Sequence, residues 1–130
     1  MKLPFNLSIN YENTARIILG SIFVIFGLNG FFNFISMPAA EGQEAAFLGA
    51  LASTGYMFPL LKTLEILAGL ALILNRYSKL ALVILAPIVV NILAFHVFLA
   101  PSGMGMAGLL TALEAYLIYK HRQSLAVLLT

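Results

Sequence analysis

The sequence predicts an all-α integral membrane protein, a four-helix bundle with a short amphipathic helix on the outer surface between helices one and two. Of its 130 residues, 62% are hydrophobic and 9% are charged, whereas soluble domains average about 45–50% and about 25%. The apolar stretches are continuous rather than alternating, which disfavours an outer-membrane β-barrel. This composition excludes an ordinary soluble domain, and we interpret residues 1–130 as a single membrane domain.

Four membrane spans are expected, at about residues 15–35, 57–75, 79–100 and 105–120. For the first, 24 residues without a charge separate Arg16 from Glu41, and about 20 are enough to cross the hydrocarbon core of a bilayer. The second span ends at the basic turn 76–79, and the fourth ends at Lys120. Pro87 removes a backbone donor within the third span, so we expect a bend there. The short links between the spans predict an antiparallel bundle.

Basic residues mark one side of this predicted bundle. Those near the span ends are Lys2, Arg16, Arg76, Lys79, Lys120 and Arg122. The other two connections contain none, and an excess of Lys and Arg marks the cytoplasmic side. We therefore expect a protein of a prokaryotic cytoplasmic membrane with both termini in the cytoplasm, where Arg16 and His121 act as anchors. Because the basic residues are scattered singly, nucleic acid is not expected as a partner.

A short surface helix is expected over residues 41–53, between the first two spans. Phe47, Leu48 and Leu51 recur there at helical spacing. Glu41 and Glu44 fall in the first turn, where the helix dipole favours acidic groups. Such a helix lies on the outer surface of the membrane. The sequence leaves open whether it is a lid over the bundle or only a connector.

Polar side chains inside the predicted spans are the candidate ligand or proton-exchange residues. They are Lys62, Glu65, Asn91, His96 and Glu114, with Asn29 and Thr111 as secondary candidates. A charge at the bilayer centre costs about 2.5–3.5 kcal/mol on insertion scales. These groups are therefore expected to face inward and to be paired or neutralised. By depth, they fall in the outer half of the bundle.

Helical spacing predicts which of these residues share a face. Lys62 and Glu65 are three residues apart on a face that continues to Gly69 and Leu72, so the first two are expected to pair. Asn91 and His96 are five apart, so their side chains point about 140° from each other on an ideal helix. In the first span, a row of small residues, Gly20, Gly27 and Gly30, predicts the close approach of another helix.

Two interpretations of the polar set remain open. In one, the side chains form a satisfied network that only fixes helix register. In the other, they are a titratable set, open to the outer leaflet, that binds a polar headgroup and moves protons. No metal is expected, because Glu65, His96 and Glu114 show no close-spaced ligand motif. Without cysteine, thiol–disulfide chemistry is excluded.

Three stretches resemble the DoxX family of small four-helix membrane proteins. They are Leu61-Lys62-Thr63-Leu64-Glu65-Ile66-Leu67-Ala68-Gly69-Leu70 with Asn75-Arg76-Tyr77, Ala86-Pro87-Ile88-Val89-Val90-Asn91-Ile92-Leu93-Ala94-Phe95-His96, and the opening Arg16-Ile17-Ile18-Leu19-Gly20 with Phe26-Gly27-Leu28-Asn29-Gly30. Lys62, Glu65, Asn91 and His96 match the family pattern, whereas Glu114 rests mainly on its depth. The resemblance links the chain to relatives associated with a thiosulfate:quinone oxidoreductase, or with membrane complexes that handle oxidative stress and sulfur species. Quinone-linked thiol oxidoreductases have a similar shape, but this chain lacks their cysteines.

The first functional hypothesis is a membrane subunit that binds a quinone or lipid headgroup and supports a redox protein partner. It has no intrinsic cofactor, and the bound quinone would be a ligand. Glu65 and His96 would exchange protons with the headgroup, Lys62 would tune Glu65, and Asn91 would orient the ring. The alternatives are a non-catalytic assembly or interaction subunit and, third, a small-solute or proton-coupled carrier. Whether the chain is an enzyme, and whether it forms a homo-oligomer, is left open.

Overall fold

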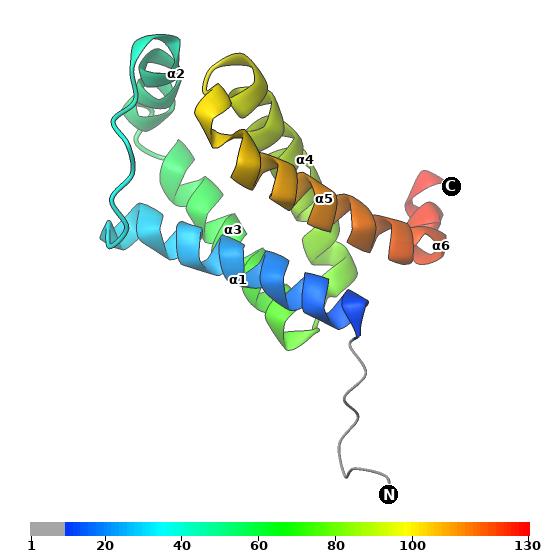
Figure 1. Cartoon of the computed structure of the whole chain (residues 1–130). Helices are drawn as coiled ribbons and strands as arrows, with labels where there is room; N and C mark the ends of the chain where they lie inside the picture. The colour runs from blue at the N-terminus through cyan, green and yellow to red at the C-terminus, as the bar shows by residue number, and fades with distance from the viewer. Residues whose placement is uncertain (1–9) are drawn as a thin grey trace, which may run out of the picture.

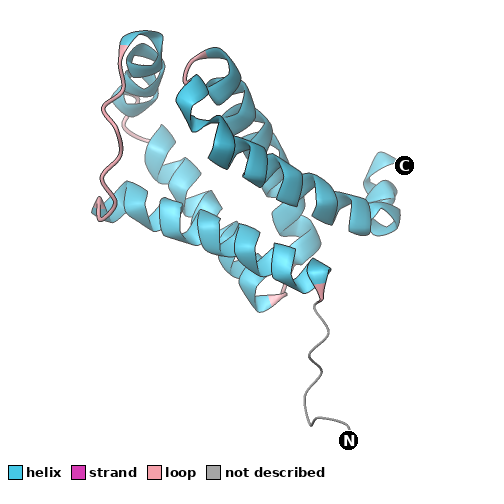
Figure 2. Cartoon of the chain, viewed as in Figure 1, coloured by secondary structure: helices cyan, strands magenta, loops and turns pink. Residues whose placement is uncertain are grey.

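The computed structural model describes residues 10–130, and every element in this part of the chain is helical (Figures 1 and 2). In chain order the elements are α1 (Tyr11–Phe32), α2 (Gly42–Ser53), α3 (Met57–Leu74), α4 (Ser78–Phe98), η1 (Pro101–Gly103), α5 (Met104–Lys120), α6 (Arg122–Leu125) and η2 (Ala126–Leu129). Lys2, which contributes to the predicted orientation, lies outside the described residues. The all-α prediction is confirmed for residues 10–130.

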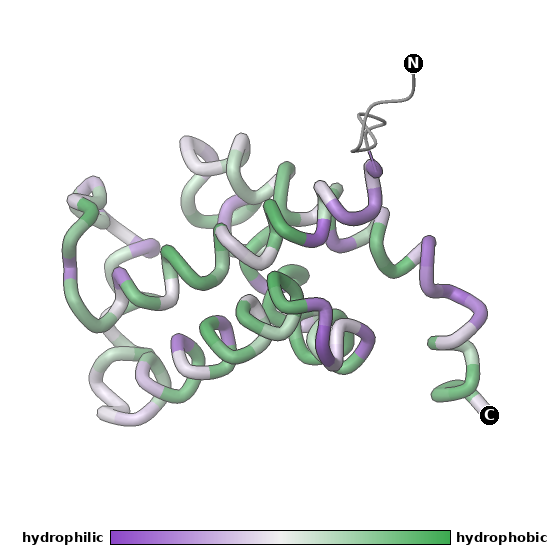
Figure 3. Tube along the Cα trace, turned by 90° about the horizontal axis from the view of Figure 1, so that it is seen from below, coloured by the Kyte–Doolittle hydropathy of each residue, from purple (hydrophilic) through white to green (hydrophobic). Residues whose placement is uncertain are grey.

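Four long helices contact one another pairwise. α1 packs against α3 and α5, and α4 packs against the same two helices (Figure 1). Each of the four contributes buried side chains to one core, whose fully buried large members are Leu19, Leu72, Leu82, Leu85 and Leu117. Outside this core, large apolar side chains lie exposed on every long helix, and apolar green runs along much of the chain in Figure 3.

Three helices, α1, α3 and α4, are long and apolar enough to cross a membrane. Exposed apolar residues on such helices suit contact with lipid tails, which have no preference for polar groups. The fourth predicted span, 105–120, is also a helix, but it has 17 residues, fewer than the roughly 20 that a typical span contains. The structure therefore supports a membrane protein with three helices of spanning length.

The observed helix boundaries lie close to the predicted ones, and the two ends of α1 are determined by capping residues. α3, α4 and α5 begin and end within two residues of the predicted limits. The first helix was expected over 15–35, but it begins at Tyr11 because the Asn10 side chain accepts a hydrogen bond from the Asn13 amide, 3.0 Å away. It ends at Phe32 because Asn33 is left-handed (φ 51°) and its amide bonds to the Asn29 carbonyl.

The predicted surface helix is present as α2, directly after Glu41. None of its residues is buried, and Phe47 contacts Phe95 of α4 with ring centroids 5.6 Å apart. α2 therefore lies beside the end of α4 as well as leading into α3 (Figure 1). The two short helices after α5, α6 and η2, were not predicted.

The backbones of α1 and α3 approach each other closely, with no side chain between them at Gly20 and Gly69. A Cβ atom built on Gly20 would lie 2.6 Å from the Gly69 carbonyl oxygen, and one on Gly69 would lie 2.7 Å from the Gly20 carbonyl oxygen. At Gly27 an added Cβ would lie 2.6 Å from a side-chain carbon of Ile66. The predicted packing role of the glycine row is confirmed, because only residues without a Cβ allow this approach.

Replacing Gly69 with alanine is expected to destabilise the fold, because its Cβ would meet the backbone of α1. The cost should be about 1–3 kcal/mol, as for other overpacked cores, measured by thermal unfolding of the purified protein in mild detergent. Gly108→Ala is the control, since a Cβ there meets nothing within 4 Å. Equal unfolding temperatures for the two variants would contradict the close α1–α3 contact.

Candidate functional site

Glu114 lies past the midpoint of α5 (Met104–Lys120), next to Leu113. The other predicted polar residues lie in the half of the molecule where α1 and α4 finish and α3 and α5 begin, which we call the Lys62 end. Here Lys62 and Glu65 form an ion pair, with Nζ and Oε2 3.2 Å apart. The Glu65 side chain is 4% exposed and that of Lys62 is 23% exposed. The predicted pairing is confirmed. Removing one partner of such a buried pair leaves an uncompensated charge, which typically costs about 3–5 kcal/mol.

The Lys62 stem is held against α1. A Cβ on Gly30 would lie 2.7 Å from Cγ and 2.8 Å from Cδ of Lys62, so the aliphatic stem crosses the helix where Gly30 has no side chain. The stem is thus packed on apolar surface while the ammonium reaches Glu65. Because of this contact, the position of the ion pair depends on the distance between α1 and α3.

The two secondary candidates bond to the backbone. The Asn29 carboxamide accepts a hydrogen bond from the Ile35 amide at 2.7 Å and donates one to the Ile35 carbonyl at 3.3 Å. It therefore fixes the chain that leaves α1. The Thr111 hydroxyl donates to the Ala107 carbonyl at 2.8 Å, within its own helix. Neither side chain is bonded to Lys62 or Glu65.

His96 is oriented by the turn that follows its helix. Its Nδ1 lies 3.0 Å from the Ala100 carbonyl oxygen. A carbonyl can only accept, so Nδ1 carries the proton in this contact and Nε2 of the neutral ring is a proton acceptor. The ring also lies so close to Gly103 that a Cβ at that position would overlap it. The sequence after α4 thus determines which ring nitrogen is free.

Glu114 lies in the core without a polar partner. It is 3% exposed, and neither carboxyl oxygen has a hydrogen-bond partner among residues 10–130. Buried polar side chains are nearly always hydrogen-bonded, so such an atom needs a specific explanation. Asn91, in contrast, is exposed on α4. The expectation that Asn91 faces inward is therefore wrong: it lies on a side of α4 that no other helix covers, unlike the buried Glu65 and Glu114.

The candidate residues do not form a single network in the part of the chain that the structure describes. Only Lys62 and Glu65 are bonded to each other, and no hydrogen bond joins Glu65, His96 and Glu114. Over the same residues, no group of three or more His, Cys, Asp or Glu side chains is placed to hold a metal ion. The site is thus an ion pair, an oriented imidazole and a buried carboxyl group on three different helices.

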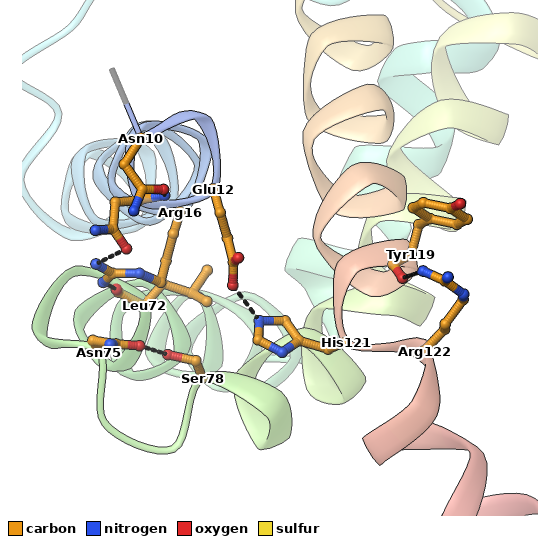
Figure 4. Close-up of polar contacts among 10 residues, drawn as sticks. Asn10, Glu12, Arg16, Leu72, Asn75, Ser78, Tyr119, His121 and Arg122 are labelled. Carbon is orange, nitrogen blue, oxygen red and sulfur yellow. Dashed lines mark hydrogen bonds and ion pairs between the residues drawn. The ribbon is translucent and has the colours of Figure 1, made fainter. Parts of the chain in front are cut away.

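Arg16 has a role that the sequence interpretation missed. It was interpreted as an interfacial anchor, but it is 8% exposed. Its guanidinium donates to the carbonyls of Leu72 and Ile73, the latter at 3.2 Å, at the end of α3 (Figure 4). Helix C-termini leave carbonyls unsatisfied and attract cations. The sequence contained an indication of this contact. Arg16 lies four residues, about one helical turn, before Gly20, so both residues share the face of α1 that approaches α3.

The orientation of His96 gives a test by nitrogen NMR. At a pH where the ring is neutral, 15N-labelled protein should show the Nδ1–H tautomer for His96, with His121→Gln used for assignment. Gly103→Ala should abolish this tautomer preference, because the added Cβ displaces the ring. Gly105→Ala should preserve it, since nothing lies within 4 Å of a Cβ there. An Nε2–H tautomer in the unmodified protein would contradict the Ala100 contact.

No family model, no curated protein and no solved structure matches this chain. We therefore base its function on the residues themselves and on the geometry described above.

Proposed function

We propose that the chain is a DoxX-like membrane subunit with four antiparallel spans, α5 being the fourth. The proposal is supported by the packing of α5 on both α1 and α4, two of the three helices of spanning length. Its predominantly apolar sequence ends at Lys120, and the basic residues Arg76 and Lys79 lie in the turn between α3 and α4. In this topology the Lys62 end faces away from the cytoplasm.

In this protein the Lys62 end binds the polar headgroup of a quinone or lipid and supports a redox partner. The observation that carries the proposal is Glu114, whose buried carboxyl oxygens lack a partner in the described chain. A ligand hydroxyl next to this group would donate the missing hydrogen bond, and a ligand carbonyl would accept one from the protonated carboxyl group. The ion pair of Lys62 and Glu65 and the acceptor nitrogen of His96 add polar groups at the Lys62 end, whereas Glu114 lies further along the bundle, in the second half of α5.

The residues would divide the work as follows. Glu65 and His96 exchange protons with the headgroup, His96 through Nε2. Lys62 tunes Glu65 and stabilises negative charge on the headgroup. If the headgroup is a quinone, two electrons from a reduced cofactor of the partner protein and two protons passed by Glu65 and His96 would convert it to the quinol, leaving the partner's cofactor oxidised. Asn91 is left out of the proposed site, because it lies exposed on α4.

A non-catalytic assembly subunit is the second candidate, and one observation favours it. Several buried or half-buried polar side chains already have partners inside the chain: Arg16 and Asn29 bond to backbone groups, and Lys62 pairs with Glu65. Such satisfied groups fix helix position without binding a ligand. This hypothesis does not explain why the buried Glu114 carboxyl has no hydrogen-bond partner among the described residues.

The test is to purify the protein in mild detergent, extract the bound lipids and measure rebinding of the quinone found. We expect a bound quinone, and about 10- to 100-fold weaker binding in Glu65→Gln and Glu114→Gln, because each variant loses a buried hydrogen bond to the headgroup. Glu41→Gln is the control, because Glu41 is exposed and its side chain makes no capping hydrogen bond.

Two results would contradict headgroup binding. One is an extract without quinone together with unchanged binding of added quinone in Glu65→Gln. The other is a loss of thermal stability in Glu65→Gln and Glu114→Gln with no change in bound lipid, which would favour the assembly subunit. The thermal unfolding of each variant is therefore measured beside its binding.

A further inference from the structure

A groove runs between α1 and α5 at the opposite end of the molecule, where α1 begins and α5 finishes. Its volume is about 540 Å³, and it is lined by Tyr11, Thr14, Ala15, Ile18, Leu113 and Tyr116. Ligand clefts commonly measure about 300–1,000 Å³. Ala15 is buried, whereas Ile18 is exposed. The groove therefore combines a buried small residue with apolar side chains that are open to the surroundings.

Positive charge lies next to this groove. The Lys120 ammonium is 5.8 Å from the ring centroid of Tyr116, one of the lining residues. Two acidic residues lie next to lining residues in sequence. Glu12, beside Tyr11, contacts His121, with Oε1 and Nε2 3.1 Å apart (Figure 4). Glu114, beside Leu113, is buried in the core. Arg122 stacks over the Tyr119 ring instead, 4.1 Å from its centroid. Lys120 has no acidic partner in the described structure. Arg16, next to Ala15 in sequence, also lacks one, but its guanidinium is bonded to carbonyls of α3.

We propose that this groove binds one acyl chain of an anionic phospholipid, with the lipid phosphate against Lys120. α1 is one of the helices long and apolar enough to span a membrane, so an apolar groove on it opens toward lipid tails. Basic pockets between spanning helices on the cytoplasmic side select anionic headgroups. A zwitterionic lipid also carries a positive group, which would repel the Lys120 ammonium, so its headgroup would be attracted less strongly than an anionic one. The lipid site rests on the proposed topology, in which α5 spans the membrane and this end faces the cytoplasm. It shares no residue with the Lys62 end and does not depend on headgroup binding there.

The experiment measures lipid binding to the full chain in mild detergent by native mass spectrometry. The probes are phosphatidylglycerol and phosphatidylcholine with identical acyl chains, added in equal amounts. We expect one tightly bound lipid per chain and about fivefold more phosphatidylglycerol than phosphatidylcholine, the preference that one basic residue near the surface provides. Lys120→Gln should remove this preference.

The matched control is Lys79→Gln. Lys79 is an exposed lysine at the same end of the molecule, in the first turn of α4, and it does not line the groove. The preference for phosphatidylglycerol should stay unchanged in this variant. An equal loss in Lys79→Gln and Lys120→Gln would overturn the proposal, because it would indicate a diffuse surface charge rather than a site.

Ile18→Trp and Leu113→Trp are designed to fill the groove from its two sides. Both should lose the bound lipid of either kind while unfolding near the temperature of the unmodified protein. If either variant is unstable, a nitroxide attached at Ile18→Cys gives an independent reading, since the chain has no other cysteine. Its mobility should fall with phosphatidylglycerol more than with phosphatidylcholine.

Three outcomes would overturn the lipid site. The first is equal retention of both lipids by the unmodified protein. The second is a nitroxide at Ile18→Cys that does not respond to either lipid. The third is a dimer that Ile18→Trp separates without changing the lipid count, which would assign the groove to a second copy of the chain.

Discussion

The close approach of α1 and α3 is the constraint on which most of the described structure depends. Lipid tails are as apolar as leucine, so helices in a membrane gain little from hydrophobic burial and associate through packing and hydrogen bonds. Gly20 and Gly69 bring two backbones together here. At that separation the Lys62 stem rests on Gly30 and Arg16 reaches the last carbonyls of α3. The polar contacts at both ends therefore follow from one apolar contact between them.

Polar side chains mostly serve the ends of helices. Arg16 and the turn at Asn75 together satisfy the C-terminus of α3: the Arg76 amide bonds to the Ala71 carbonyl at 3.0 Å and the Asn75 amide to the Leu72 carbonyl at 3.2 Å. This is the Schellman arrangement, with Asn75 in the left-handed region (φ 53°). Backbone groups without partners are especially costly in lipid. Against this background, Glu114 stands out among the described residues, because its buried carboxyl oxygens have no hydrogen-bond partner.

Much of the fold was predictable because it depends on local patterns. A charge-free run located the first long helix, and the turns between apolar segments located the other three. The three-residue spacing of Lys62 and Glu65 predicted their pairing. The bond from Arg16 to the carbonyls of α3 was not predicted. A count of basic residues near helix ends indicates the side of the membrane, but it does not identify the atoms that each side chain contacts. The predicted divergence of Asn91 and His96 agrees with their places, one exposed and the other bonded to the Ala100 carbonyl.

The rest of the candidate site could not be predicted because it depends on contacts between distant segments. Nothing in the residues around Glu114 indicates whether another helix brings it a donor. Likewise, the free nitrogen of His96 is determined by Ala100 and by the space at Gly103, beyond the end of its helix. The short α6 and η2 were not predicted because helices of only four residues leave little periodic signal.

The ion pair of Glu12 and His121 has a consequence for how the molecule can be joined to others. It holds the first turn of α1 beside the end of α5, so the first and last of the four long helices have neighbouring ends. Two copies could therefore be fused in tandem through a short flexible linker, without an additional crossing segment. The same neighbourhood allows reporter groups on the two ends to sense a common environment.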